Sequence, residues 1–377
     1  MAKKNLKEAK ETKKDEFYTQ LEDIEKEIIN YRDFFKDKIV LCNCDDPYES
    51  NFFKYFALNF NNFGLKKLIA TCYATSPVMG QQLSIFDLYD EEGNLRPEPV
   101  GRAYKIEIVE VKGLNNSNAY TLFDVEHLIK NKKNVLTMLK GNGDFRSNEC
   151  IELLKEADIV CTNPPFSLFR EFIALLEEYE KKFIIIGNTN ALTYRETFKL
   201  IKEDRLRTGY TNFNVGMYFF VPDTWEKYHK IKDGRKMVRV STSCWFTNLE
   251  VKKHKEKRIL WKTYNEKDYP KYYNFDAINI NKVDDIPADW DGYMGVPITF
   301  LDKYNPEQFE IIGLGISNSG IEIGVKPYTE EHKTYRKEIQ KRGAVDGDLY
   351  MIENGIVNVP YARVIIKKRG LTNENQS

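Results

Sequence analysis

The tetrapeptide Asn163-Pro164-Pro165-Phe166 combines residue types that could hold a planar ring carrying an amino group. It ends the apolar run at 157–162, which predicts a buried strand, and open α/β sheets bind ligands at the carboxyl ends of their strands. The Asn163 amide and the Pro164 carbonyl could both accept hydrogens from the amine, while Phe166 stacks on the ring. The nitrogen lone pair would then be less delocalised and could attack an activated methyl group. The alternative is a simple tight turn, because Asn-Pro dipeptides commonly start turns.

Three other segments could bind a small cofactor. They are Phe17, Tyr18 and Thr19 before the first predicted helix, Asp45, Asp46 and Pro47 after the first predicted strand, and Asp144 and Phe145 after a glycine. The acidic turn would repel phosphate, so it disfavours NAD or ATP and favours a cationic, phosphate-free cofactor such as S-adenosylmethionine. Asp144 could accept from an adenine amine while Phe145 stacks on its ring. Each segment also has a purely structural explanation: a hydrophobic staple, an acidic helix start and a Gly-Asp turn.

Two later segments could contact a nucleic acid. Trp245 and Phe246 lie in a strand-like run and could line a base pocket opposite Phe166, although core packing is the simpler explanation for an aromatic strand. A basic run that could bind phosphates, or form a solvated face, comprises Lys252, Lys253, Lys255 and Arg258.

Composition limits the class of protein. The chain has 377 residues, 42% of them hydrophobic, with 57 basic and 57 acidic residues. Its zero net charge gives no global signal for nucleic acid, although a local cleft can still be basic. No apolar run approaches the roughly 18 residues of a membrane helix, and the charged start is unlike a signal peptide. Six scattered cysteines and only four histidines predict a cytoplasmic protein with reduced thiols and no metal site.

Apolar periodicity predicts a strand, a helix and a second strand early in the chain, which form a βαβ unit and hence a parallel sheet. The first expected elements are a helix at about 20–36 and strands at 39–42 and 68–72, with a Ser50-capped helix ending at Gly64 between them. The alternating run at 104–111 predicts an inserted hairpin or an extra strand. The later elements, in chain order, are a helix near 147–156, the strand ending at 163, a helix at about 167–179, a strand at 183–186 and a helix near 192–204. Segments 215–221 and 237–248 predict an antiparallel pair at the sheet edge.

The predicted fold class is α/β, with a Rossmann-like domain followed by a smaller mixed domain. The first domain has a mostly parallel sheet and an antiparallel edge hairpin. We expect a flexible N-terminus at 1–14, a catalytic domain at 15–250 and a second domain at 251–377, where the βαβ rhythm gives way to short strands and turns.

Taken together, these segments resemble the EcoRI-type DNA adenine-N6 methyltransferases, which depend on S-adenosylmethionine. The resemblance covers about residues 15–365 and is carried by FYTQ at 17–20, CNCDDP at 42–47, GDFR at 143–146, NPPFSLF at 163–169, CWFTN at 244–248 and PITFL at 297–301. It implies that Asn163 and Pro164 accept hydrogen bonds from the target adenine amine and that Phe166 stacks on the base. It implies that the cofactor is held by Tyr18, Thr19, Asp45, Asp46 and Asp144, and that target recognition lies after about residue 250.

The chain departs from the wider methyltransferase superfamily in two places. Its first turn lacks the usual glycine, and its second strand ends in Thr71-Cys72-Tyr73 without an acidic residue. Asp45 or Asp46 could then take over the contact to the cofactor ribose.

We therefore expect a DNA adenine-N6 methyltransferase that acts on an extruded adenine in a specific duplex sequence, in a restriction–modification or related system. The expected partner is double-stranded DNA. We also expect a monomer, and a paired restriction endonuclease that makes no stable contact. The alternatives are an RNA or protein-glutamine methyltransferase of the same fold, or an inactive nucleic-acid-binding relic. No Pro-Cys dipeptide occurs, which disfavours cytosine-C5 chemistry.

Overall fold

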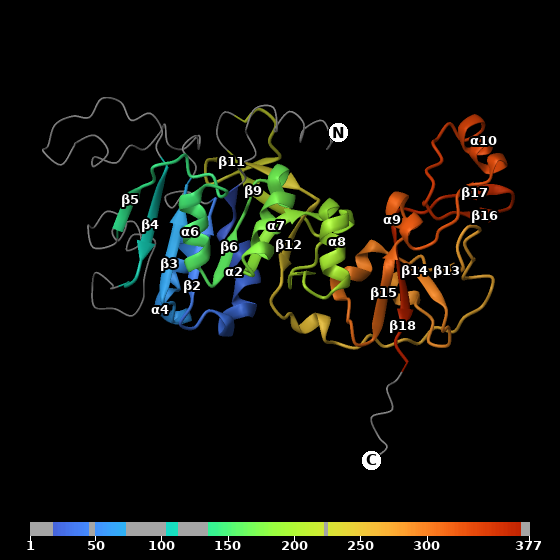
Figure 1. Cartoon of the computed structure of the whole chain (residues 1–377), viewed down its shortest axis with the longest axis horizontal. Coiled ribbons are helices and arrows are strands. Elements are labelled where there is room, and N and C mark those ends of the chain that lie inside the picture. The colour runs from blue at the N-terminus through green and yellow to red at the C-terminus, as the bar shows by residue number, and fades with distance from the viewer. Residues whose placement is uncertain (1–17, 45–49, 73–102, 112–134, 222–224, 371–377) are drawn as a thin grey trace, which may run out of the picture. The chain divides into compact units, whose positions relative to one another are not determined.

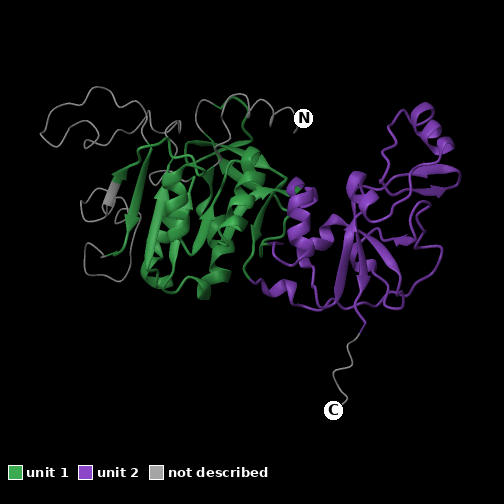
Figure 2. Ribbon diagram, in the orientation of Figure 1, with its two compact units in different colours: residues 1–189, 208–249 green, residues 190–207, 250–377 purple. Residues whose placement is uncertain are grey.

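The computed structural model describes residues 18–44, 50–72, 103–111, 135–221 and 225–370. The chain divides into two compact units, residues 1–189 with 208–249 and residues 190–207 with 250–377 (Figure 2). The second unit thus includes residues 190–207, which the sequence analysis assigned to the first domain. The expected flexible segment at 1–14 and the cofactor candidates Phe17, Asp45, Asp46 and Pro47 lie outside the described residues.

The first unit is built on an eight-stranded sheet with the order β5-β4-β3-β2-β6-β7-β12-β8 (Figure 1). Its strands are β2 (Ile39–Asn43), β3 (Lys67–Thr71), β4 (Tyr104–Ile108), β5 (Val135–Met138), β6 (Ile159–Thr162), β7 (Lys182–Asn188), β8 (Arg207–Thr208) and β12 (Ser243–Thr247). Strands β3, β2, β6 and β7 run parallel, whereas β4, β5 and β12 pair antiparallel with their neighbours. The expected mostly parallel sheet is therefore a mixed sheet with a parallel centre, because antiparallel strands extend it on both sides.

Capping residues visible in the sequence set the ends of the helices in this unit. The Ser50 hydroxyl accepts from the first N–H groups of α3 (Asn51–Leu58), and Ser147 caps α6 (Asn148–Glu156) in the same way. Gly64 ends α4 (Phe60–Phe63) in the left-handed conformation, with φ 63°. The other helices are α2 (Leu21–Ile28), which continues as the 3₁₀ helix η1 (Ile29–Phe34), and α7 (Phe169–Glu178), which follows the 3₁₀ helix η3 (Phe166–Leu168). These elements confirm the expected helices.

A second, four-stranded sheet in the first unit has the order β1-β9-β11-β10. It consists of β1 (Tyr18–Thr19), β9 (Met217–Phe220), β10 (Lys230–Lys232) and β11 (Arg235–Val240), all antiparallel. The expected antiparallel pairing of 215–221 with 237–248 is confirmed for β9 and β11, but its expected place at the edge of the main sheet is wrong. The chain turns at Ser241 and Thr242, so the rest of the segment leaves as β12 and joins the main sheet beside β7.

A buried carboxylate ties the loop before β9 to α2. Glu27 on α2 is fully buried and accepts hydrogen bonds from the Tyr31 hydroxyl at 2.8 Å, the Tyr210 N–H at 2.6 Å, and the N–H and hydroxyl of Thr211 at 2.7 Å each. Gly209 leaves room for it, since a Cβ there would lie 2.1 Å from Glu27 Oε1. No cation of the described chain pairs with Glu27, so these four donors stabilise its charge.

The second unit contains a four-stranded sheet, β13-β14-β18-β15, and a two-stranded sheet, β16-β17. The strands are β13 (Ala277–Asn279), β14 (Tyr293–Pro297), β15 (Phe309–Leu314), β16 (Met351–Glu353), β17 (Ile356–Asn358) and β18 (Arg363–Lys368). The helices are α8 (Arg195–Lys202), α9 (Ser317–Glu322) and α10 (Glu330–Glu338), and the 3₁₀ helices in this half are η4 (Thr189–Thr193), η5 (Lys252–His254), η6 (Val283–Asp285) and η7 (Ile298–Lys303). An apolar core that includes Tyr272, Leu349 and Ile365 holds the unit together.

Replacing Glu27 with alanine should lower the free energy of unfolding by about 3 kcal/mol or more, because the partly buried N–H groups of Tyr210 and Thr211 would lose their hydrogen bonds to the carboxylate. Urea denaturation followed by circular dichroism measures this loss. The matched control is Glu22→Ala on the same helix, where the glutamate is exposed and forms a surface ion pair with Lys232, so we expect a change within about 0.5 kcal/mol. Equal losses in the two variants would contradict this role of Glu27.

Candidate active site

Three neighbouring parallel strands end in polar residues that the strand register places side by side. These residues, here termed the polar row, are Thr71 of β3, Asn43 of β2 and Thr162 of β6. Asn43 pairs with Thr71 across the ladder, and the Thr162 hydroxyl donates to the backbone carbonyl of Asn43. All three are at most 2% exposed. The polar row lies at the carboxyl edge of the sheet, immediately before Asn163, which is where α/β folds bind ligands.

Several buried polar atoms near this edge have no hydrogen-bond partner in the described part of the chain. They are Oγ1 of Thr71, Oδ1 of Asn43 and Oγ1 of Thr19 on β1. Buried polar atoms are nearly always paired, because leaving one unpaired costs about 1–3 kcal/mol. The three atoms therefore mark a place where a polar ligand can supply the missing partners.

The loop at 163–166 lies between the polar row and the small sheet. Pro164 is buried, while Asn163, Pro165 and Phe166 are partly exposed. The Leu168 N–H donates to the Pro165 carbonyl at 3.0 Å, which closes the turn into α7. The Phe166 ring meets Phe219 of β9 edge-on, with centroids 6.2 Å apart. Since Phe219 is the register partner of Thr19, the structure brings Phe166 and the pre-helix segment to the same part of the molecule.

The start of α3 is tied to β1. The Asn51 side chain, in the first turn of α3, donates to the Thr19 carbonyl at 2.7 Å. Tyr18 is half-buried, and the Arg235 guanidinium lies 5.9 Å from its ring centroid. Cys44, directly after β2, adopts φ 76°, a left-handed conformation that usually favours glycine. Cys44 therefore enters the first turn in a backbone conformation that glycine adopts more easily.

The Gly143-Asp144 loop packs against the end of β3. A Cβ on Gly143, whose φ is 76°, would lie 2.1 Å from the carbonyl oxygen of Cys72, so only glycine fits this close approach. Asp144 accepts from the N–H and Nε of Arg146 at 2.9 Å each and from its Nη2 at 2.7 Å, and these hydrogen bonds hold the pKa of Asp144 below its usual range. A carboxylate accepts about four hydrogen bonds, so Asp144 retains capacity for a ligand.

The aromatic candidates away from the loop are core residues in this state. Phe145 is 4% exposed and packs edge-on against Phe172 of α7 at 5.0 Å. Trp245 and Phe246 are 1% and 0% exposed, and Phe246 contacts Phe169 at 5.0 Å. Phe145 and Phe246 therefore pack against α7, and the Trp245 ring meets Phe52 of α3 edge-on at 5.8 Å. Cofactor stacking by Phe145 and base contact by Trp245 and Phe246 stay predictions.

Three of the four basic candidates hold carboxylates of their own unit. Lys253 is buried and pairs with Asp302 at 2.9 Å, Lys255 pairs with Glu250 at 2.6 Å, and Arg258 pairs with Asp284 at 2.9 Å. Lys252 is exposed on η5. DNA binding by these residues stays a prediction, and the buried ion pair gives Lys253 a structural role that the sequence analysis did not foresee.

Comparison with known proteins identifies the family. A profile of the family described as "Adenine-specific methyltransferase EcoRI" matches residues 5–369. The chain belongs to this family. The Type II methyltransferase M.EcoRI of Escherichia coli is 45% identical over 334 residues, which cover 86% of this chain and 94% of that protein. The Type II methyltransferase M.MpnI of Mycoplasma pneumoniae is 40% identical over 318 residues, which cover 81% of this chain and 83% of that protein. No solved structure matches the chain.

Membership of the EcoRI methyltransferase family confirms the resemblance and the expected activity, that of a site-specific DNA adenine methyltransferase. The reaction requires a methyl donor, and its substrate is DNA. In the part of the chain that the structure describes, no helix has both the length and the apolar character to cross a membrane.

The sequence analysis missed the polar row, Asn51 and Phe219. A signal for the polar row was present, because the apolar runs at 39–43, 67–71 and 159–162 each end in Asn or Thr. A polar residue that ends a fully buried strand of an α/β sheet marks the ligand edge. Phe219 carried no such signal, since its neighbours Thr19 and Phe166 are distant in sequence.

Gly187 of β7 should be essential for the position of the loop at 163–166. A Cβ there would lie 2.3 Å from the Phe169 ring, which begins α7 three residues after Phe166. We expect Gly187→Ala to lower the free energy of unfolding by about 1–3 kcal/mol and to reduce methylation, because Phe169 must move and the loop moves with it. Denaturation and a methylation assay measure the two effects.

A double-mutant cycle with Phe169→Leu tests the cause. Leucine has no ring and should relieve the clash. The double variant should therefore lose less free energy of unfolding than the two single variants lose together. Gly343→Ala is the control, since a Cβ there meets nothing within 4 Å. Additive losses, or a Gly187→Ala protein as stable as the wild type, would refute the steric argument.

Proposed function

We propose that this protein transfers the methyl group of S-adenosylmethionine to the N6 amine of an adenine extruded from a specific duplex sequence. The observation that carries the proposal is the meeting of the loop at 163–166 with buried, unpartnered polar atoms at the carboxyl edge of the parallel strands. Because duplex DNA hides the N6 edge, the base must leave the stack at a cost of roughly a few kcal/mol.

The residues of the loop orient the amine. The Asn163 side-chain oxygen and the Pro164 carbonyl accept the two N6 hydrogens, and this leaves the nitrogen lone pair free to point at the methyl carbon. Phe166 stacks on the base and keeps its plane fixed. In the transfer, the N6 nitrogen would bond to the methyl carbon as the bond from that carbon to the cofactor sulfur breaks, and the amine would release one proton to solvent, with no covalent intermediate on the protein. Catalysis thus rests on positioning and on acceptors that stabilise the positive charge developing at N6.

The described residues fit a phosphate-free, polar cofactor. Thr19, Asn43 and Thr71 offer unpartnered oxygens, and Asp144 keeps acceptor capacity beside the close approach made by Gly143. When bound, S-adenosylmethionine supplies an electrophilic methyl group. Tyr18 and the acidic turn, Asp45 and Asp46, are the further contacts that the family resemblance implies.

The wider setting follows from the relatives and the composition. The relatives are named Type II methyltransferases, so we place this protein in a restriction–modification system, with an endonuclease that acts on the same DNA without stable contact. We assign target recognition to the second unit, after about residue 250. None of the six cysteines, all of which the structure describes, forms a disulfide, and this fits a reducing cytoplasm. We also infer that the protein works as a monomer.

Replacing Asn163 with alanine should lower the rate of methylation at least about a hundredfold, because one of the two acceptors for the amine is lost. Mass spectrometry of nucleosides from DNA of expressing cells measures N6-methyladenine. Phe166→Ala should also lose methylation activity, whereas Phe166→Tyr, which keeps a flat ring, should retain it. Asn62→Ala, an exposed site in the same unit, is the control. Methylated RNA or methylated glutamine in place of methylated DNA would contradict the proposal.

Replacing Thr19 with valine should separate stability from cofactor binding. The Thr19 hydroxyl is buried without a partner, so valine should raise the free energy of unfolding by up to about 1 kcal/mol and weaken S-adenosylmethionine binding about tenfold. Denaturation and isothermal titration calorimetry measure the two quantities.

The matched control is Thr247→Val on β12. The Thr247 hydroxyl donates to the Phe183 carbonyl at 2.7 Å and accepts from the Leu249 N–H at 3.0 Å, so valine should cost about 2 kcal/mol or more there and leave cofactor binding unchanged. If Thr19→Val binds the cofactor as the wild type does, Thr19 has no part in the cofactor site.

A further inference from the structure

The second unit carries a small body that is distinct from its main sheet. This body, here termed the ribbon lobe, spans residues 328–359 and contains α10 and the two-stranded ribbon β16-β17 (Figure 1). Tyr328, Tyr350 and Val357 form its own core, in which the rings of Tyr328 and Tyr350 stack with centroids 4.2 Å apart. Gln340, just after α10, donates to the Val357 carbonyl at 2.8 Å, so helix and ribbon are held as one piece.

The ribbon ends in a tight turn suited to a narrow space. Asn354 and Gly355 have φ 52° and 76°, the two left-handed residues of a type I′ hairpin turn. Both residues of the turn are exposed, as is Ile356, with 53% of its surface accessible. A two-stranded ribbon of this kind fits the major groove of B-form DNA, which is about 12 Å wide.

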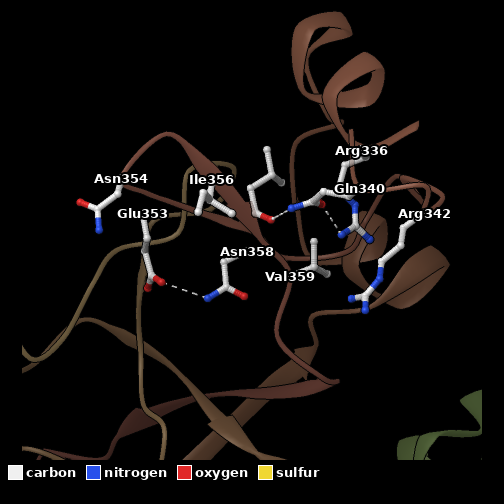
Figure 3. A pocket seen from close by; sticks show the side chains of 9 residues that line it. Arg336, Gln340, Arg342, Glu353, Asn354, Ile356, Asn358 and Val359 are labelled. Atoms are coloured by element: carbon white, nitrogen blue, oxygen red, sulfur yellow. Dashed lines mark hydrogen bonds between the residues drawn. The ribbon is translucent and has the colours of Figure 1, made fainter. Parts of the chain in front are cut away.

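Beside the ribbon lies a polar hollow of about 290 Å³ (Figure 3). Its lining includes Arg336, Gln340, Arg342, Glu353, Asn354 and Asn358. Figure 3 shows that Arg336 is joined to Gln340 and that Asn358 is joined to Glu353, at 2.8 and 3.0 Å. These bonds fix the walls of the hollow. The side chains of Arg342 and Asn354 have no partner among the described residues and remain available to a ligand.

The chemistry of the hollow matches base edges better than phosphate. Glu353 would repel a phosphate group in the hollow, whereas a base edge can use a carboxylate, an amide and a guanidinium together. Arginine pairs with guanine, asparagine with adenine, and glutamate accepts from cytosine. An exposed isoleucine such as Ile356 suits the methyl group of thymine.

The rim of the ribbon lobe has the complementary charge for a DNA backbone. Lys337 and Lys341 are exposed, and no carboxylate of the described chain pairs with them. This differs from the run at 252–258, where Lys253, Lys255 and Arg258 already hold protein carboxylates. Unpaired cations thus lie beside hydrogen-bond donors and acceptors. This arrangement is typical of DNA-binding proteins, in which phosphate contacts position the protein and base contacts specify the sequence.

We propose that the ribbon lobe reads the DNA sequence for this methyltransferase. Arg342 and Asn354 contact base edges in the major groove, and Lys337 and Lys341 contact the flanking phosphates. This inference rests on the proposed methylation of adenine in a specific duplex. It narrows target recognition from the whole second unit to one ribbon and one helix.

The test uses the purified full chain and the duplex that it methylates. Mapping N6-methyladenine in DNA from cells expressing the wild type gives the site, and two oligonucleotide duplexes follow from it, one intact and one with a base pair changed outside the target adenine. Arg342→Ala and Asn354→Ala should each weaken binding to the intact duplex about 5- to 100-fold. They should also reduce the ratio of the affinity for the intact duplex to the affinity for the changed duplex. Lys341→Ala should weaken both duplexes alike and reduce the slope of log affinity against log salt by about 1.

The control is Lys303→Ala, which removes an exposed lysine elsewhere in the same unit and should leave affinity, salt slope and methylation as in the wild type. S-adenosylmethionine affinity and unfolding midpoint, measured for every variant, should stay at wild-type values. If the wild type methylates its site, but the Arg342 and Asn354 variants bind the intact duplex and discriminate against the changed duplex as well as the wild type does, the inference is wrong and the proposed function stands. If the wild type methylates no DNA, the proposed function falls and the inference falls with it.

Discussion

Parallel hydrogen bonding between β3, β2 and β6 is the constraint on which the site depends. In this arrangement every strand ends at the same edge, so the register that buries the apolar residues also aligns Thr71, Asn43 and Thr162. The loop at 163–166 begins one residue later and therefore starts at that edge. Because an antiparallel neighbour ends at the opposite edge, the antiparallel strands β4 and β12 widen the sheet without contributing to this row.

The small sheet completes the site through two buried contacts of different kinds. The Glu27 carboxylate gathers the N–H groups before β9, and Phe219 on β9 meets Phe166 while pairing with Thr19. Removing a buried carboxylate costs free energy because its donors lose the hydrogen bonds that they make to it. The Glu27 carboxylate therefore stabilises one position of the loop before β9 relative to α2, and with it the position of β9 beside the loop at 163–166 and the pre-helix segment.

Much of the fold could be read from the sequence because apolar runs and capping residues are local signals. Ser50 and Gly64 marked the ends of their helices, and each parallel strand showed as a short apolar run. The segment at 237–248 misled because alternation continues through it, while the turn at Ser241 and Thr242 lacks glycine and proline. The aromatic residues Phe145, Trp245 and Phe246 showed a second limit, since ring identity does not tell which side of a strand or loop faces the ligand.

The sequence also does not show which basic side chains are paired with carboxylates in the folded protein. The run at 252–258 is the most basic stretch of the second unit, yet its cations meet carboxylates as far along the chain as Asp302, 49 residues after Lys253. Arg342 and Lys341 stand in a less conspicuous stretch, and no carboxylate that the structure describes pairs with either of them. For a protein with zero net charge whose substrate is a polyanion, local pairing must decide where attraction survives. A cation already paired with a protein carboxylate contributes less to the field felt by a phosphate than an unpaired one, so a basic run in the sequence does not by itself locate the surface that attracts DNA.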